Sequence, residues 1–133
     1  MTIETKETIE GLAPIVGSAM CAIATGSKTI YLSGQVGTKA DGTMAGDTLA
    51  AQTEQAFRNV VTALAANGAT VADVAKITFY VVDWSPEKLD GLFEGAIAAL
   101  GEGLAVTATT LVGVQALFEP DWLIEIDVTA VLD

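Results

Sequence analysis

The amino-acid sequence predicts an α+β layer, of the broader α/β type, in which one mixed sheet carries two helices packed on one face. Two segments, at about 47–67 and 85–100, repeat apolar residues at the spacing of an amphipathic helix. The segments 76–82 and 123–132 are β-branched or strictly alternating, as strands are. The predicted order is β-β-α-β-α-β-β, and residues 1–133 fit a single domain.

The first part of the chain predicts a tail and a hairpin. Residues 1–12 are mostly polar and are expected to form a flexible N-terminal tail. Residues 19–24 predict a short buried strand, and residues 29–32 predict a second strand that pairs back on it. The turn between them, residues 25–28, contains Gly26. This region therefore supplies the first two strands of the expected sheet.

Capping residues set the expected helix boundaries. Asp47 is a good N-cap for the first helix, and Asn67-Gly68 is a common stop. Thr70-x-x-Asp73 predicts a capped turn before the strand 76–82. Ser85-Pro86 predicts the start of the second helix. The strands 106–114 and 123–132 then complete the sheet.

The charge of the chain excludes several classes of partner. The formal net charge is −11, from 17 acidic and 6 basic residues, and Arg58 is the only arginine. Binding to nucleic acid or to an anionic membrane needs a basic surface, so neither is expected. With no histidine and no phosphate-binding glycine loop, we expect no metal and no cofactor. Cys21 is the only cysteine, and the start of the chain is acidic, which predicts a cytoplasmic protein without a signal peptide.

Two carboxylates on the last strand are candidates for acid–base chemistry. Glu125 and Asp127 are two residues apart, so they lie on the same face of the strand. Glu125 stands between two isoleucines, and partial desolvation there would suit a general acid or base. The alternative is that both carboxylates lie on the solvated face of an edge strand.

Backbone and hydroxyl groups supply further candidates. Gly34, next to Ser33, would let a ligand approach the main chain, although a simple β-bulge is the alternative. Thr107, Thr109 and Thr110 place hydroxyls on both faces of a strand, where threonine is also common for packing.

Four segments resemble the RidA/YjgF family of small imine-handling proteins. The resemblance covers about residues 19–131 and depends on these motifs: Tyr31–Val36, the first helix with Ala51-Gln52 and Asn59-Val60, Lys76–Asp83 and Ile124–Val131. It implies a chorismate-mutase-like fold and a homotrimer with small-molecule ligand clefts at the subunit interfaces. Family deaminases hydrolyse reactive imines or enamines, made from amino acids by pyridoxal phosphate enzymes, to keto acids and ammonia.

The resemblance also assigns positions in the cleft. Ser33 and Gly34 match the cleft backbone of the family, and Glu125 matches a glutamate that orients the attacking water. The other family positions are altered here: Thr109 replaces the arginine that grips a substrate carboxylate, Leu111 replaces a cysteine, Ala19 or Met20 replaces a tyrosine, and Asp90 or Gly91 replaces an asparagine. Threonine cannot form the bidentate hydrogen bonds that a guanidinium makes to a carboxylate.

The sequence therefore predicts a RidA-like enzyme that acts on a neutral or cationic imine, enamine or related metabolite, by hydrolysis or tautomerisation. Glu125 would be its acid or base. It would not be a standard 2-iminopropanoate deaminase, because the carboxylate grip is absent. The alternative is a non-catalytic trimer that binds a ligand or a protein. Nuclease activity, sometimes attributed to this family, is opposed by the charge of −11.

Overall fold

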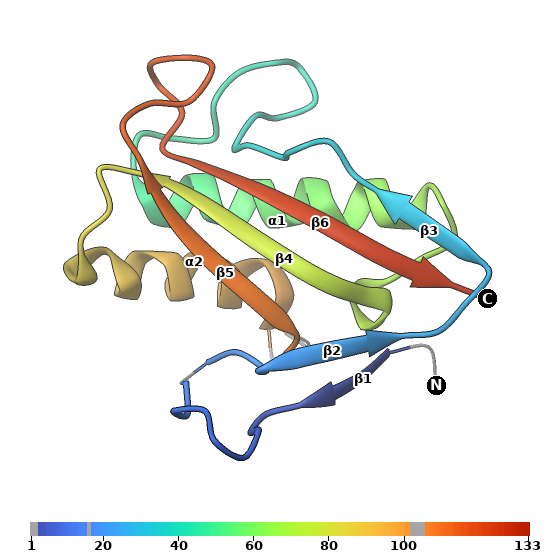
Figure 1. Cartoon of the computed structure of the whole chain (residues 1–133). Helices are drawn as coiled ribbons and strands as arrows, with labels where there is room; N and C mark the ends of the chain where they lie inside the picture. Colours follow the sequence, from blue (N-terminus) through green and yellow to red (C-terminus); the bar gives the residue numbers. More distant parts are fainter. Residues whose placement is uncertain (1–2, 16, 102–105) are drawn as a thin grey trace.

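The computed structural model describes residues 3–15, 17–101 and 106–133. Its elements follow the predicted order, with one strand added before them (Figure 1). They are β1 (Ile3–Lys6), β2 (Cys21–Ala24), β3 (Lys28–Tyr31), α1 (Leu49–Ala65), the 3-10 turn η1 (Val71–Asp73), β4 (Val74–Val82), the 3-10 turn η2 (Pro86–Lys88), α2 (Leu89–Leu100), β5 (Ala108–Val114) and β6 (Ile124–Leu132).

The main sheet has four strands in the order β3-β6-β4-β5. β5 runs parallel to β4, while β6 is antiparallel to both of its neighbours, so the sheet is mixed as the sequence predicts. Figure 1 shows α1 and α2 together behind this sheet, and no described helix covers its front face. The α+β class with two helices on one face is confirmed.

The N-terminal region differs from the prediction. Residues 3–6 are not a tail but form β1, which pairs antiparallel with β2. β2 therefore does not form a hairpin with β3, which pairs with β6 at the edge of the main sheet. The buried side chain of Ile3 anchors β1. Although β3 follows β2 closely in the sequence, β2 pairs with β1 instead. The small β1–β2 sheet meets the main one through a parallel bridge between Ala19 and Ala108.

The core lies between the main sheet and the helices. Ile124, Ile126 and Val128 of β6 are at most 1% exposed, because alternate strand residues point to the same face. From α1, Phe57 and Leu64 pack into the same cluster. The intervening residues of β6, which include Glu125, therefore lie on the face away from the helices.

Side-chain caps fix the start of α1 and of η1, whereas Ser85 makes no capping hydrogen bond before η2. The N-cap of α1 is Thr48 rather than Asp47, because the Thr48 hydroxyl accepts a hydrogen bond from the N–H of Ala51 at 3.2 Å. The Thr70–Asp73 capping box is present as predicted. The second helix begins with the turn η2, so α2 proper starts at Leu89. None of the described helices is long and apolar enough to cross a membrane.

Candidate functional site

Glu125 lies directly against the backbone of Gly34. After β3 the chain stays beside β6, where Gln35 and Ile126 exchange two backbone hydrogen bonds of 2.8 Å. A β-carbon built on Gly34 would stand 2.5 Å from Cδ and 2.7 Å from Oε2 of Glu125. Only glycine therefore allows the carboxylate to occupy this position. Gly34 is exposed, and its N–H donates to no other group among the described residues.

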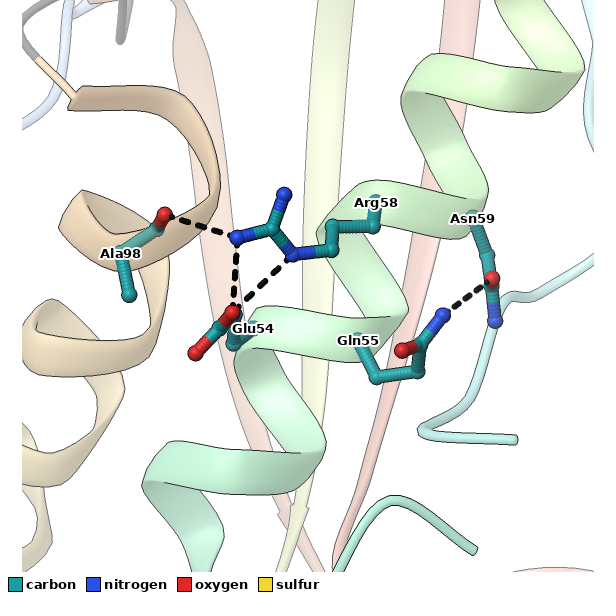
Figure 2. Close-up of polar contacts among 5 residues, drawn as sticks. All are labelled: Glu54, Gln55, Arg58, Asn59 and Ala98. Atoms are coloured by element: carbon teal, nitrogen blue, oxygen red, sulfur yellow. Dashed lines mark hydrogen bonds and ion pairs between the residues drawn. The ribbon is translucent and has the colours of Figure 1, made fainter. Parts of the chain in front are cut away.

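Helix α1 fixes the segment that follows Gly34. The Asn59 amide donates to the carbonyls of Val36 and Thr38 at 2.9 and 2.8 Å. Gln55, one turn earlier, donates to Asn59 Oδ1 at 2.9 Å and so fixes the orientation of that amide (Figure 2). Two side chains of one helix thus hold the chain beside the candidate site.

The start of β6 is fixed by a second amide. Gln52 is 1% exposed. Its Nε2 donates to the carbonyls of Gly46 and Asp121, both at 3.0 Å, and its Oε1 accepts from the N–H of Leu123 at 2.8 Å. All of these groups are satisfied, as buried polar groups require. The loop before β6, and with it Glu125, is therefore tied to α1.

The face around Glu125 also carries Tyr80, which the sequence analysis did not single out. Tyr80 of β4 is opposite Glu125 in register, and Thr78 is opposite Asp127. Asp127 is exposed, whereas Glu125 is half-buried. The alternation of residues 76–82 could have shown that Tyr80 shares a face with Glu125 once the pairing of β4 with β6 was known.

Thr109 and Leu111 lie on the opposite face of the sheet from Glu125. They are opposite Ile77 and Phe79 of β4, which face the helices. Thr109 lines a cavity of about 60 Å³ between the sheet and α2. Its hydroxyl donates to the carbonyl of Thr107 at 3.0 Å. One subunit therefore does not bring Thr109 to the Glu125 carboxylate.

The two remaining candidates are separate from Glu125. Met20 lies just before β2, where its N–H donates to the carbonyl of Lys6 at 2.8 Å. The neighbouring Ala19 N–H donates to the Thr107 carbonyl at 3.1 Å, which places this segment beside the Thr109 strand. Asp90 is exposed in the first turn of α2 and lines neither the cavity nor the Gly34 bend.

Arg58 does not supply the absent carboxylate grip. Its guanidinium bonds Glu54 at 2.8 and 3.0 Å and the carbonyl of Ala98 on α2 at 3.2 Å (Figure 2). These contacts hold the only arginine at the junction of the two helices. Within residues 3–15, 17–101 and 106–133, no cluster of three or more His, Cys, Asp or Glu side chains could hold a metal ion.

Comparisons with known proteins identify the family. The family model described as Endoribonuclease L-PSP matches residues 12–132. A Yersinia pestis protein of unknown function, YyfB of the conserved Rid family, is 36% identical with a TM-score of 0.88, over 99% of this chain and 100% of that one. A member of the YjgF/YER057c/UK114 family from Mycobacterium tuberculosis is 32% identical with a TM-score of 0.64, over 88% of each chain.

A more distant structure is RidA from an Antarctic Psychrobacter, which is 26% identical with a TM-score of 0.68 over 99% of each chain. No match was found among the curated proteins. The family model covers nearly the whole chain, and two solved structures exceed 30% identity over most of it. The chain therefore belongs to the Rid family, also described as YjgF/YER057c/UK114.

Proposed function

We propose that this protein is a Rid-type enzyme that hydrolyses imines or enamines lacking a carboxylate, with Glu125 as the general base. The observation that carries the proposal is the placement of the Glu125 carboxylate against the bare backbone of Gly34. The family position for a substrate-binding arginine is Thr109, and Arg58 is engaged by Glu54 and Ala98. A neutral or cationic substrate suits a site in which threonine stands at the position of that arginine.

The chemistry needs one water molecule and one base. Glu125 takes a proton from water as the water oxygen attacks the imine carbon, and that proton passes to the nitrogen to give a neutral carbinolamine. Glu125 then takes the proton of the new hydroxyl group and passes it to the leaving nitrogen. The carbon–nitrogen bond breaks, which releases a carbonyl product and ammonia or an amine. In this proposal the Gly34 N–H, which no described group accepts, donates a hydrogen bond to the attacking oxygen. Tautomerisation of an enamine would use the same carboxylate.

The complete site would lie between subunits of a homotrimer. Glu125 is on the uncovered face of the sheet and Thr109 is on the helix face of the edge strand β5. A ring of three subunits, each giving its Glu125 face to the Thr109 edge of the next, would bring the two halves together. Uncovered apolar residues such as Val112 are consistent with such contacts.

The first test is imine hydrolysis, with imines generated by an amine oxidase or an amino-acid oxidase and the remainder trapped by semicarbazide. We expect acceleration with the amine-derived imine and little with the carboxylate-bearing one. Glu125→Gln should remove the activity while leaving the thermal melt unchanged. Rapid hydrolysis of the carboxylate-bearing imine alone would contradict the proposal, because some other group would then hold the anion.

Thr109→Arg tests whether restoring an arginine at this position restores binding of a substrate carboxylate. A guanidinium at this position should raise turnover of the carboxylate-bearing imine and lower that of the neutral one, because arginine binds a carboxylate through two hydrogen bonds. Thr109→Lys is the matched control, since it adds the same charge without the planar fork. Unchanged preference in both variants would place the substrate elsewhere.

Mixed trimers test whether the site is shared. When Glu125→Gln and Thr109→Arg subunits assemble at random, about one quarter of the sites should combine an intact Glu125 with an intact Thr109. Activity on the neutral imine should then exceed that of either pure variant. A site contained in one subunit would give no gain. The alternative function, a non-catalytic binding trimer, would show no turnover in any of these assays.

A nuclease is not supported. The net charge of −11 opposes binding to phosphates. Of the six basic residues, Arg58 and Lys88 are engaged in ion pairs with Glu54 and Asp83. RNA cleavage by the purified protein, abolished in Glu125→Gln, would overturn this conclusion.

A further inference from the structure

The cavity beside Thr109 has an almost entirely apolar wall. Three phenyl rings, from Phe57, Phe79 and Phe93, surround it together with the side chains of Ile77, Leu92 and Ala96. The Phe57 and Phe79 rings meet edge to face, with centroids 5.8 Å apart, which fixes the inner end. The cavity volume is about 60 Å³. Among the residues that the structure describes, no charged side chain lines it.

The two threonines in the cavity wall, Thr107 and Thr109, leave the cavity largely apolar. Thr107 is 4% exposed, and its hydroxyl lies 3.2 and 2.9 Å from the carbonyls of Val74 and Ala75. The Thr109 hydroxyl donates its hydrogen to the carbonyl of Thr107. Both hydroxyl hydrogens are therefore committed to the backbone. From these two threonines a ligand meets an acceptor oxygen, which can take an N–H but cannot hold an anion.

The cavity opens at the surface beside β5. Phe93 and Val106 stand at this side and are 40% and 45% exposed. Gly17 lies against the Phe93 ring, where an added β-carbon would come within 3.6 Å of it. Gly17 has a φ of +79°, a conformation that favours glycine. The wall of the cavity therefore includes two partly exposed side chains, those of Phe93 and Val106.

We infer that this cavity binds a short alkyl substituent of an uncharged or cationic substrate. The inference rests on the proposed function for the identity of that substrate as an imine. A dry cavity of about 150 Å³ accommodates benzene, so a cavity of about 60 Å³ favours an unbranched or singly branched chain over an aromatic ring. The alkyl group lies among the phenyl rings, and its nitrogen faces the Thr109 oxygen.

Substrate series provide the first test. Imines generated from ethylamine, n-propylamine, n-butylamine and benzylamine should differ in kcat/KM by about fourfold for each methylene that the cavity can bury, because burial of one CH₂ contributes about 0.8 kcal/mol. The increase should stop at the length that fills the cavity, and the benzylamine-derived imine should be poor. A flat series would overturn the inference.

Variants of α2 test whether the dependence of kcat/KM on alkyl chain length arises at this cavity. Ala96→Leu should fill the cavity and abolish the preference for longer chains, whereas Ala98→Leu, on the exposed side of the same helix, should not. Because a larger residue at buried position 96 could prevent folding, Phe93→Ala provides a second probe at the exposed entrance. It should enlarge the opening and raise the relative rate of the benzylamine-derived imine at least tenfold. An unchanged ratio in a folded Phe93→Ala protein would overturn the inference.

Xenon separates this inference from the proposed function. Dry apolar cavities bind xenon, so crystals of the intact protein under xenon pressure should show an atom between the rings of Phe57 and Phe93. Xenon bound in a protein without imine hydrolysis would support the apolar cavity while contradicting the proposed enzyme. An empty cavity under pressure, in a protein that does hydrolyse imines, would overturn the inference alone.

Discussion

Replacing Gly34 by alanine should remove the activity of Glu125 without unfolding the protein. The new β-carbon would stand 2.5 Å from Cδ of Glu125 and 2.7 Å from its Cγ. Non-bonded carbon atoms prefer separations of about 3.5–4.0 Å, so the carboxylate has to retreat by about 1 Å or more. A displacement of that size can cost about 100-fold in rate. We expect a loss of kcat of this order on the amine-derived imine.

The same substitution should affect stability only slightly. The clash involves the far end of a flexible, half-buried side chain, and an off-rotamer torsion costs about 0.5–1.5 kcal/mol. Alanine also restricts the unfolded chain relative to glycine, which offsets about 0.4–1 kcal/mol. The expected change in melting temperature is therefore within about 6 °C. A much larger loss of stability would mean that the clash is not relieved by Glu125.

A double-variant cycle checks the cause. In a Glu125→Gln background, Gly34→Ala should produce little further loss of turnover, because the carboxylate that it displaces is already gone. Gly91→Ala is the matched control, since its nearest contact would be an ordinary 3.7 Å to Leu49. Full activity in Gly34→Ala would refute the reasoning, because Glu125 could not then act from its place against residue 34.

Three other variants test the supports of the site. Gly95→Ala should destabilise the protein by about 1–3 kcal/mol in urea titration, since its β-carbon would lie 2.5 Å from the backbone oxygen of Ala50 on α1; stability equal to the parent would mean that the helices separate freely. Gln52→Leu should cost at least 2 kcal/mol, because the Leu123 N–H and two carbonyls lose their partner, and an unchanged midpoint would contradict the role of Gln52. Arg58→Ala should change stability by less than about 1 kcal/mol, because its ion pair is exposed, and should leave turnover unchanged; loss of turnover would place the arginine in the site.

The main sheet and its helices could be predicted because each element depends on local pattern. The alternation of β6 puts Ile124 and Ile126 in the core and Glu125 on the other face, and this follows from strand period alone. The pairing of β2 could not be predicted in this way, since strand partners are chosen by tertiary contacts. Buried Ile3 gives β2 its partner in β1, and no turn signal marks that choice.

The candidate site was predictable only in part for the same reason. Gly34 and Glu125 could be singled out as residue types, but their contact depends on the pairing of Gln35 with Ile126 across more than ninety residues. The apolar cavity was not foreseen. Its three phenyl rings come from α1, β4 and α2, and nothing in the sequence shows that these rings converge on Thr109.

In the proposed shared site, the Glu125 half and the Thr109 half lie on opposite faces of the sheet, which has a consequence for substrate choice. Asn59 and Gln52 of α1 hold the Gly34–Glu125 half, on one face of the sheet. The Thr109 half is built on the other face by β5 and α2, together with Phe57 of α1 and Phe79 of β4. Because alternate residues of a strand point to opposite faces, a substitution at Thr109 would change the wall of the cavity without contacting the Glu125 carboxylate. The proposed function therefore implies that substrate preference and acid–base chemistry can vary independently.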